Sequence, residues 1–98
     1  MKDLFKHIID FIKNVLKEED IIIMLEKMVD PKQRKSYIKD IKNQKILEFI
    51  VENDNNFSVR IEALKFIKSR KFLEKALLDE NKQVQRTANK RLKELKND

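Results

Sequence analysis

The 98-residue chain has no cysteine, no glycine and no tryptophan, and it contains one proline and one histidine. The absence of cysteine excludes disulfides, thiolate metal ligands and cysteine nucleophiles. The absence of glycine disfavours phosphate-binding loops, which need close backbone approach, and tight β-hairpin turns, which prefer Asn-Gly or Asp-Gly. A chain so poor in glycine and proline is typical of helices joined by short polar turns. We therefore expect an all-α protein.

Side chains that could support catalysis are few and scattered. His7 is the only histidine, so a histidine metal site has no second histidine, and the serines have no histidine other than His7 to form a catalytic triad. Glu18, Glu19 and Asp20 are consecutive, which makes them diverge around a helix instead of converging as an acid–base pair. Their negative charge suits the N-terminus of a helix. We expect a non-enzymatic protein without a metal ion or cofactor.

Long apolar runs are also absent. The chain lacks the roughly 18 consecutive apolar residues that a helix needs to cross a membrane. Charged residues such as Lys6 and Asp10 interrupt its first apolar stretch, and no small-residue cleavage site follows, unlike the pattern of a signal peptide. We expect a cytoplasmic location and no membrane partner.

Residues 2–17 show the clearest helical periodicity. At about 100° per residue, the large apolar side chains fall on one half of the helix and the polar residues fall on the other. The apolar half consists of Leu4, Phe5, Ile8, Ile9, Phe11, Ile12, Val15 and Leu16. Such a helix suits a cap on the core, a partner helix or a membrane surface. Asp3 and Asp10 dilute the positive charge of the polar half, which favours the capping helix.

Six further helices are predicted beyond this segment. One of them starts at Asp30-Pro31, a capping residue followed by proline at the first helical position. Polar turn segments at 53–56 and 79–81 separate later helices. The predicted helices lie at 21–29, 31–41, 44–52, 57–69, 71–78 and 81–96.

The chain repeats itself with a period of 25 residues. Asp54-x4-Val59-Arg60-x2-Ala63-x3-Ile67 recurs as Asp79-x4-Val84-Gln85-x2-Ala88-x3-Leu92. A looser copy, with a turn shorter by two residues, aligns Asp30, Arg34, Tyr37 and Ile41 with Asp54, Arg60, Ala63 and Ile67. One short helix pair cannot bury both apolar faces, so such pairs stack into a continuous core. We expect one domain over 1–98, with helix pairs at 20–42, 44–69 and 71–96.

This motif resembles the short HEAT-like repeats of small bacterial and archaeal proteins, in which a turn Asp precedes a Val-Arg step and an Ala. The resemblance covers about residues 20–96. It implies a short right-handed α-solenoid of about three helix pairs plus an N-terminal capping helix. In that family the turn Asp and the Arg of the next helix form a ladder between repeats. The resemblance assigns this structural role to Asp30, Arg34, Asp54, Arg60 and Asp79, whereas Gln85 stands where the family has Arg.

Positive charge is concentrated on the second helix of each predicted pair. The second helices carry 14 basic and three acidic residues. The first helices carry four basic and seven acidic residues. The resemblance places the second helices on a concave surface, where their basic residues would form ridges lying side by side. The candidate binding residues are Lys32, Lys35, Lys39 and Lys42 on the first ridge, Lys65 on the middle helix, and Lys82, Arg86, Lys93 and Lys96 on the last ridge.

A concave surface of one charge sign attracts an anionic partner. We expect an interaction or scaffold module that binds an acidic or helical protein segment through this basic face. The alternative is sequence-nonspecific nucleic-acid binding through the same face, because lysines neutralise phosphates without reading bases. Aromatic residues for stacking on single-stranded bases are scarce, and Tyr37 is the only one near the ridges. A solvated face without a partner is the third interpretation.

Overall fold

In this computed structural model residues 18–96 are described, and all regular elements among them are α-helices. The predicted helix at 2–17 lies outside the described residues. The helices are α2 (Glu18–Lys27), α3 (Pro31–Ile38), α4 (Gln44–Asn53), α5 (Phe57–Leu64), α6 (Arg70–Ala76) and α7 (Lys82–Lys96). The all-α prediction is confirmed for this part of the chain.

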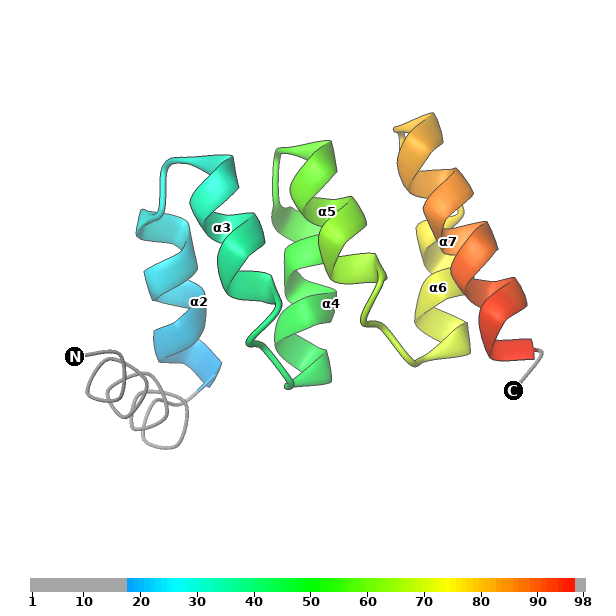
Figure 1. The fold of residues 1–98 in the computed structure, drawn as a ribbon, viewed down its shortest axis with the longest axis horizontal. Coiled ribbons are helices and arrows are strands. Elements are labelled where there is room, and N and C mark those ends of the chain that lie inside the picture. The colour runs from blue at the N-terminus through cyan, green and yellow to red at the C-terminus, as the bar shows by residue number, and fades with distance from the viewer. Residues whose placement is uncertain (1–17, 97–98) are drawn as a thin grey trace.

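The helices form three consecutive pairs, α2 with α3, α4 with α5 and α6 with α7, which follow one another across Figure 1. In one layer α3 packs against α5, and α5 packs against α7. In the other layer α2 packs against α4, and α6 lies behind α7 in Figure 1. First and second helices of the pairs therefore occupy different layers.

The hydrophobic core lies between these two layers. Val59 and Ala63 of α5 and Val84 and Ala88 of α7 are all 0% exposed, so the two repeated apolar stripes face the core. An alanine in the middle of each stripe allows neighbouring helices to approach closely. Leu47, Leu64, Ile67 and Leu73 are also fully covered and complete the centre of the core.

Each of the helices from α3 to α6 begins at a side chain that satisfies its first backbone N–H groups. Asp30, Asn43, Asn56 and Ser69 are the N-cap residues, and each side chain accepts a hydrogen bond from the backbone of the first turn. Asn81 Oδ1 accepts in the same way from Gln83 N and Val84 N at the start of α7. These local bonds explain why the helix starts lie within a few residues of the predicted positions.

The helices α3 and α5 are shorter than the predicted 31–41 and 57–69. After Ile38 and Leu64 the backbone N–H groups bond to the carbonyl oxygen three residues earlier, instead of four as in an α-helix. Ile41 N donates to Ile38 O, and Ile67 N donates to Leu64 O. This turn directs Ile41 and Ile67 into the core from a loop, where they are 8% and 0% exposed. The apolar spacing that suggested longer helices thus belongs partly to buried loop residues.

Asn56→Ala is expected to lower the free energy of unfolding by about 1 kcal/mol, because Ser58 N and Val59 N lose their acceptor at the start of α5. Urea denaturation followed by circular dichroism measures this loss. Asn56→Asp is the matched control, since its carboxylate retains an acceptor at the positive end of the helix. Equal losses in both variants would contradict the capping role.

Candidate interaction surface

Two arginines make the same set of contacts in successive helix pairs. Arg34 of α3 donates from Nε to Asp54 Oδ2 at 2.8 Å and from Nη2 to Asp54 Oδ1 at 3.1 Å. Arg60 of α5 donates to the two carboxylate oxygens of Asp79 at 3.1 and 3.2 Å. Each guanidinium is a planar fork that matches a carboxylate at two points. These forked ion pairs join the first helix pair to the second and the second to the third.

Each of the residues at this repeat position also binds the carbonyl oxygen six residues earlier. Arg34 Nη1 donates to Met28 O at 2.6 Å, and Arg60 Nη1 donates to Asp54 O at 2.8 Å. Gln85 Nε2 donates to Asp79 O at 2.6 Å. Gln85 therefore keeps the contact within its own pair but lacks the guanidinium that would reach a further carboxylate. Its neutral side chain avoids an unpaired buried charge.

Asp30 does not hold the position that the sequence alignment assigned to it. Its carboxylate accepts from Lys32 N at 2.9 Å and caps α3, as Asn56 caps α5. The carbonyl contact of Arg34 shows that Met28 is the counterpart of Asp54. Equivalent residues of the first and second helix pairs are thus 26 positions apart. The turn of the first pair is not two residues shorter, as the sequence alignment had assumed. The sequence alignment matched Asp30 with Asp54 because aspartate is common at helix N-caps and also at the repeat position that pairs with arginine.

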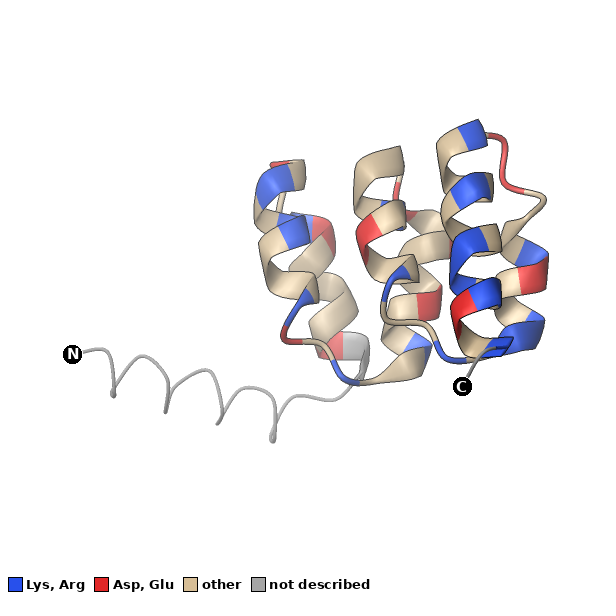
Figure 2. Ribbon diagram, turned by 45° about the vertical axis from the view of Figure 1, so that its right-hand side comes forward, with Lys and Arg blue, Asp and Glu red and all other residues tan. Residues whose placement is uncertain are grey.

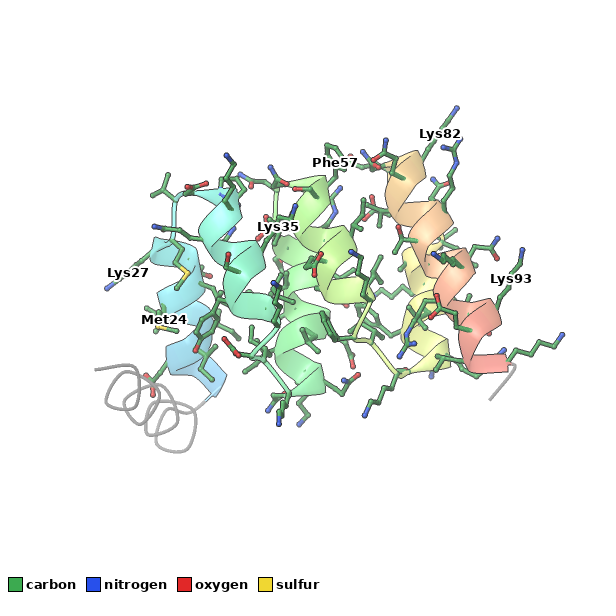
Figure 3. All side chains as sticks on the ribbon, in the orientation of Figure 1. Met24, Lys27, Lys35, Phe57, Lys82 and Lys93 are labelled. Atoms are coloured by element: carbon green, nitrogen blue, oxygen red, sulfur yellow. The ribbon has the colours of Figure 1, made fainter. Side chains whose placement is uncertain are left out.

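Three of the predicted lysines surround one hollow between α3 and α5. Lys32, Lys35 and Lys39 line it with Ser36 and with Glu62 of α5, and its volume is about 410 Å³. We call this site the α3–α5 hollow. Figure 3 places Lys35 between the two helices. The arrangement brings three lysines and a serine to one open surface.

Glu62 is the acidic member of the α3–α5 hollow and was not predicted as a site residue. Its Oε2 lies 3.1 Å from Lys65 Nζ, and this pair reduces the charge that each side chain offers to a ligand. Ser36 could have been found from its spacing, since it lies between Lys32 and Lys39 at helical intervals. Glu62 had no such signal, because its place at the hollow depends on how α5 packs against α3.

The remaining predicted residues of the first ridge are not all on a helix. Because α3 ends at Ile38, Lys39 is its C-cap and the exposed Lys42 lies in the loop before α4. The ridge predicted for one helix therefore divides into a helical part at the hollow and a loop part. A lysine at a helix C-terminus is favoured by the helix dipole.

The predicted ridge on α7 points in a different direction from the lysines at the α3–α5 hollow. Lys82, Arg86, Lys93 and Lys96 are exposed on α7, and Figure 3 shows Lys82 and Lys93 pointing away from α5. The helix α5 lies between α3 and α7, so the two ridges do not lie side by side. Figure 2 shows dense basic colouring on α7 and little on α5. The exposed basic residues of this layer are therefore concentrated at the α3–α5 hollow and on α7, and the exposed Lys65 lies at the C-cap of α5 between them.

The charge available to a partner is also smaller than the sequence count suggests. Arg34 and Arg60 contribute two of the 14 basic residues in this layer, and each is paired with an aspartate. Arg91 donates from Nε to Ile67 O at 3.0 Å and holds the loop after α5. These arginines serve the fold, and lysines dominate what remains exposed.

Tyr37 of α3 is partly buried and packs against the core. Burial raises the pKa of its phenol above the ordinary value of 10.0, and the negative charge of Asp40 adds to this effect. The side chain therefore stays neutral at physiological pH. It occupies the position where the later repeats have Ala63 and Ala88, as the sequence alignment indicated.

Gln44 is a structural residue that sequence reasoning missed. Its side-chain amide donates to Phe66 O at 2.9 Å and accepts from Lys68 N at 2.9 Å. The α5–α6 loop is thus held by Gln44 from α4 and by Arg91 from α7. No local pattern could reveal this, since the bonded residues lie more than 20 positions apart.

Within residues 18–96, no group of three or more His, Cys, Asp or Glu side chains is arranged to hold a metal ion. No helix in the same range is long and apolar enough to span a membrane. No protein-family model matches the chain, and no curated protein or solved structure matches it either.

Proposed function

We propose that the chain is a non-enzymatic interaction module, a short right-handed solenoid of HEAT-like helix pairs that binds an acidic protein segment at the α3–α5 hollow. The observation that supports this proposal is the gathering of Lys32, Lys35 and Lys39 around one open hollow. The two-layer packing and the repeated Arg–Asp pairs are compatible with a solenoid. Localisation in the cytoplasm is part of the same proposal.

A protein segment suits the hollow better than a nucleic acid does. Nucleic acids gain affinity from many phosphate contacts along a continuous basic track. Here α5 interrupts the track between α3 and α7, and Glu62 places a carboxylate at the hollow. An acidic helix instead presents a few carboxylates at fixed spacing, and three lysines with a serine hydroxyl can bind them by charge-assisted hydrogen bonds.

The test uses a fluorescein-labelled amphipathic peptide rich in glutamate, with a glutamine-substituted peptide as its neutral counterpart. Lys32→Glu/Lys39→Glu is expected to weaken binding of the acidic peptide at least tenfold, or about 1.4 kcal/mol. The matched control is Lys45→Glu/Lys71→Glu, which changes the net charge equally on exposed positions of α4 and α6. The affinity of this control variant for the acidic peptide is expected to stay within about twofold of the wild-type affinity, or about 0.4 kcal/mol. Fluorescence anisotropy measures both.

Two outcomes would overturn the proposal. Equal losses in both double variants would show attraction to net charge and no specific surface. Tighter binding of the glutamine peptide than of the acidic one would show that the lysines do not determine recognition. Backbone amide shifts in an NMR titration provide a second readout, and they are expected to be largest in residues 31–42.

A second candidate function is nucleic-acid binding through α7, favoured by the four exposed basic residues on that helix. Duplex DNA binding would then fall with rising salt, since phosphate contacts release counterions. Arg86→Glu/Lys93→Glu would abolish it, whereas Lys32→Glu/Lys39→Glu would leave most of it. No duplex binding at about 50 mM salt would exclude this candidate.

A further inference from the structure

The α3–α5 hollow carries more positive charge than its own carboxylate can neutralise. Lys32, Lys35 and Lys39 line it, and within the part of the chain that the structure describes none of the three side chains forms an ion pair. Glu62 supplies a carboxylate to the hollow, but its ion-pair partner is Lys65 at 3.1 Å. The three lysines are therefore left with their charge available to a ligand.

These lysines are spaced so that they can reach one anionic group together. Lys32 and Lys39 are seven residues apart, which at 1.5 Å per residue is about 10 Å along the helix axis. Ser36 is exposed between them and lines the same hollow. Residues three or four positions apart are neighbours on a helix surface, so Ser36 is adjacent to both lysines. An anion above Ser36 thus lies within reach of long side chains from both turns.

A phosphate monoester matches this arrangement better than a single carboxylate does. It carries a charge of about −1.5 to −2 at pH 7 and three strong acceptor oxygens, whereas a carboxylate carries one charge and two oxygens. Coulombic attraction to the lysines grows in proportion to the charge of the ligand. An incoming carboxylate adds only the kind of group that Glu62 already supplies to the hollow. The charge of the hollow therefore favours the phosphate.

The lining of the hollow favours a protein, and not a lipid, as the carrier of this phosphate. None of the described residues that line it is apolar; they are Lys32, Lys35, Ser36, Lys39 and Glu62. Surfaces that bind membranes bury apolar side chains in the headgroup region in addition to their attraction to anionic lipids. At this hollow the carboxylate of Glu62 would instead meet the anionic lipid surface. A phosphorylated side chain of a protein needs no apolar contact here.

We propose that the α3–α5 hollow recognises a phosphorylated serine or threonine in the partner segment, with Lys32, Lys35 and Lys39 binding the phosphate. This inference rests on the proposed function, because it names the anionic group that the acidic segment brings to the hollow. Ser36 donates a further hydrogen bond from its hydroxyl to a phosphate oxygen. Charge-assisted hydrogen bonds from several lysines to one dianion account for the expected preference over a carboxylate.

Three glutamate-rich amphipathic peptides that differ at one central position test the proposal. The position is phosphoserine, glutamate or serine, and fluorescence anisotropy at about 150 mM salt measures each dissociation constant. The phosphoserine peptide is expected to bind at least tenfold more tightly than the glutamate peptide. Lys35→Gln is expected to reduce this ratio to within twofold. Lys45→Gln is the matched control, because it removes the same charge from an exposed position of α4, and it is expected to keep the ratio.

The possible failures of this test have different meanings. Equal affinities of the phosphoserine and glutamate peptides would overturn phosphate recognition and leave the proposed function standing. Binding of none of the acidic peptides would overturn both. A tenfold preference that persists in Lys35→Gln and in Lys32→Gln/Lys39→Gln would place the phosphate outside the hollow. Tighter binding to phosphatidic acid vesicles than to the phosphoserine peptide would identify a lipid as the carrier and overturn the proposal.

A ³¹P NMR titration of the bound phosphoserine peptide gives a second measurement. The second pKa of a phosphate monoester is ordinarily about 6. Lysines around the phosphate favour its dianion, so this pKa is expected to fall below about 5.5 in the complex with the wild-type chain. In the complex with Lys35→Gln, at saturating protein, it is expected to lie closer to its ordinary value. An unchanged phosphate pKa in the wild-type complex would show that the lysines do not surround the phosphate, and would overturn the proposal.

Discussion

Arg60→Ala is expected to lower the free energy of unfolding by about 3 kcal/mol. The side chains of Arg60 and Asp79 are only 8% and 13% exposed, so the substitution leaves a largely covered carboxylate without its cation. It also removes the donor that Arg60 supplies to Asp54 O, the bond that holds the turn before α5. Removing one member of a buried pair is destabilising because the desolvation of the other remains. Urea denaturation monitored by circular dichroism measures the change.

The controls separate this effect from the loss of a positive charge. Arg86→Ala removes the same side chain from the exposed surface of α7 and is expected to change stability by less than about 0.5 kcal/mol. Arg60→Lys keeps the charge but loses the two-point geometry, so an intermediate loss is expected. If Arg60→Ala is no more destabilising than Arg86→Ala, the Arg60–Asp79 pair does not stabilise the contact between helix pairs.

Phenylalanine in place of Ala63 or Ala88 is expected to destabilise the fold by about 2–3 kcal/mol. Both alanines are 0% exposed, and α5 packs directly against α7, so a ring at either position displaces one helix from the other. Thermal and urea unfolding of each variant measure the loss. Asn89→Phe is the matched control, because it adds the same ring at the neighbouring, exposed position of α7.

A small destabilisation by Ala88→Phe would contradict the close packing of α5 against α7. If Ala88→Phe is no more destabilising than Asn89→Phe, the α5–α7 contact is looser than the packing of the repeated stripes indicates. The repeat alignment that pairs Ala63 with Ala88 would then lose its physical basis, since the alanines would not be required for close approach.

Much of the local structure could be predicted from the residues. The start of α3 follows from Asp30-Pro31, and the starts of α5 and α7 follow from the polar segments that contain Asn56 and Asn81. Helix starts are predictable because a cap bonds to backbone groups only two or three residues away. The ends of α3 and α5 were less predictable, because buried loop residues such as Ile67 continue the apolar spacing of a helix.

The candidate site was predicted only in part. Lys32, Lys35 and Lys39 were identified from their spacing, and the structure places them around one hollow. The presence of Glu62 at this hollow could not be predicted from charge counts, because it depends on how α5 packs against α3. The partner of each arginine also depends on packing, since Arg34 meets Asp54 across 20 residues and Arg60 meets Asp79 across 19.

By itself, the composition almost without glycine and proline predicted the helices found within residues 18–96, and polar capping residues predicted where several of these helices begin. These properties depend on backbone geometry and on contacts within one or two helical turns, which neighbouring residues control. The tertiary structure alone decided that Met28, and not Asp30, corresponds to Asp54. It also decided that Glu62 of α5 joins the three lysines at the α3–α5 hollow and that residues of α2, α3 and α4 line a second pocket. These features depend on how helices distant in sequence pack together, and local side-chain preferences do not encode that packing.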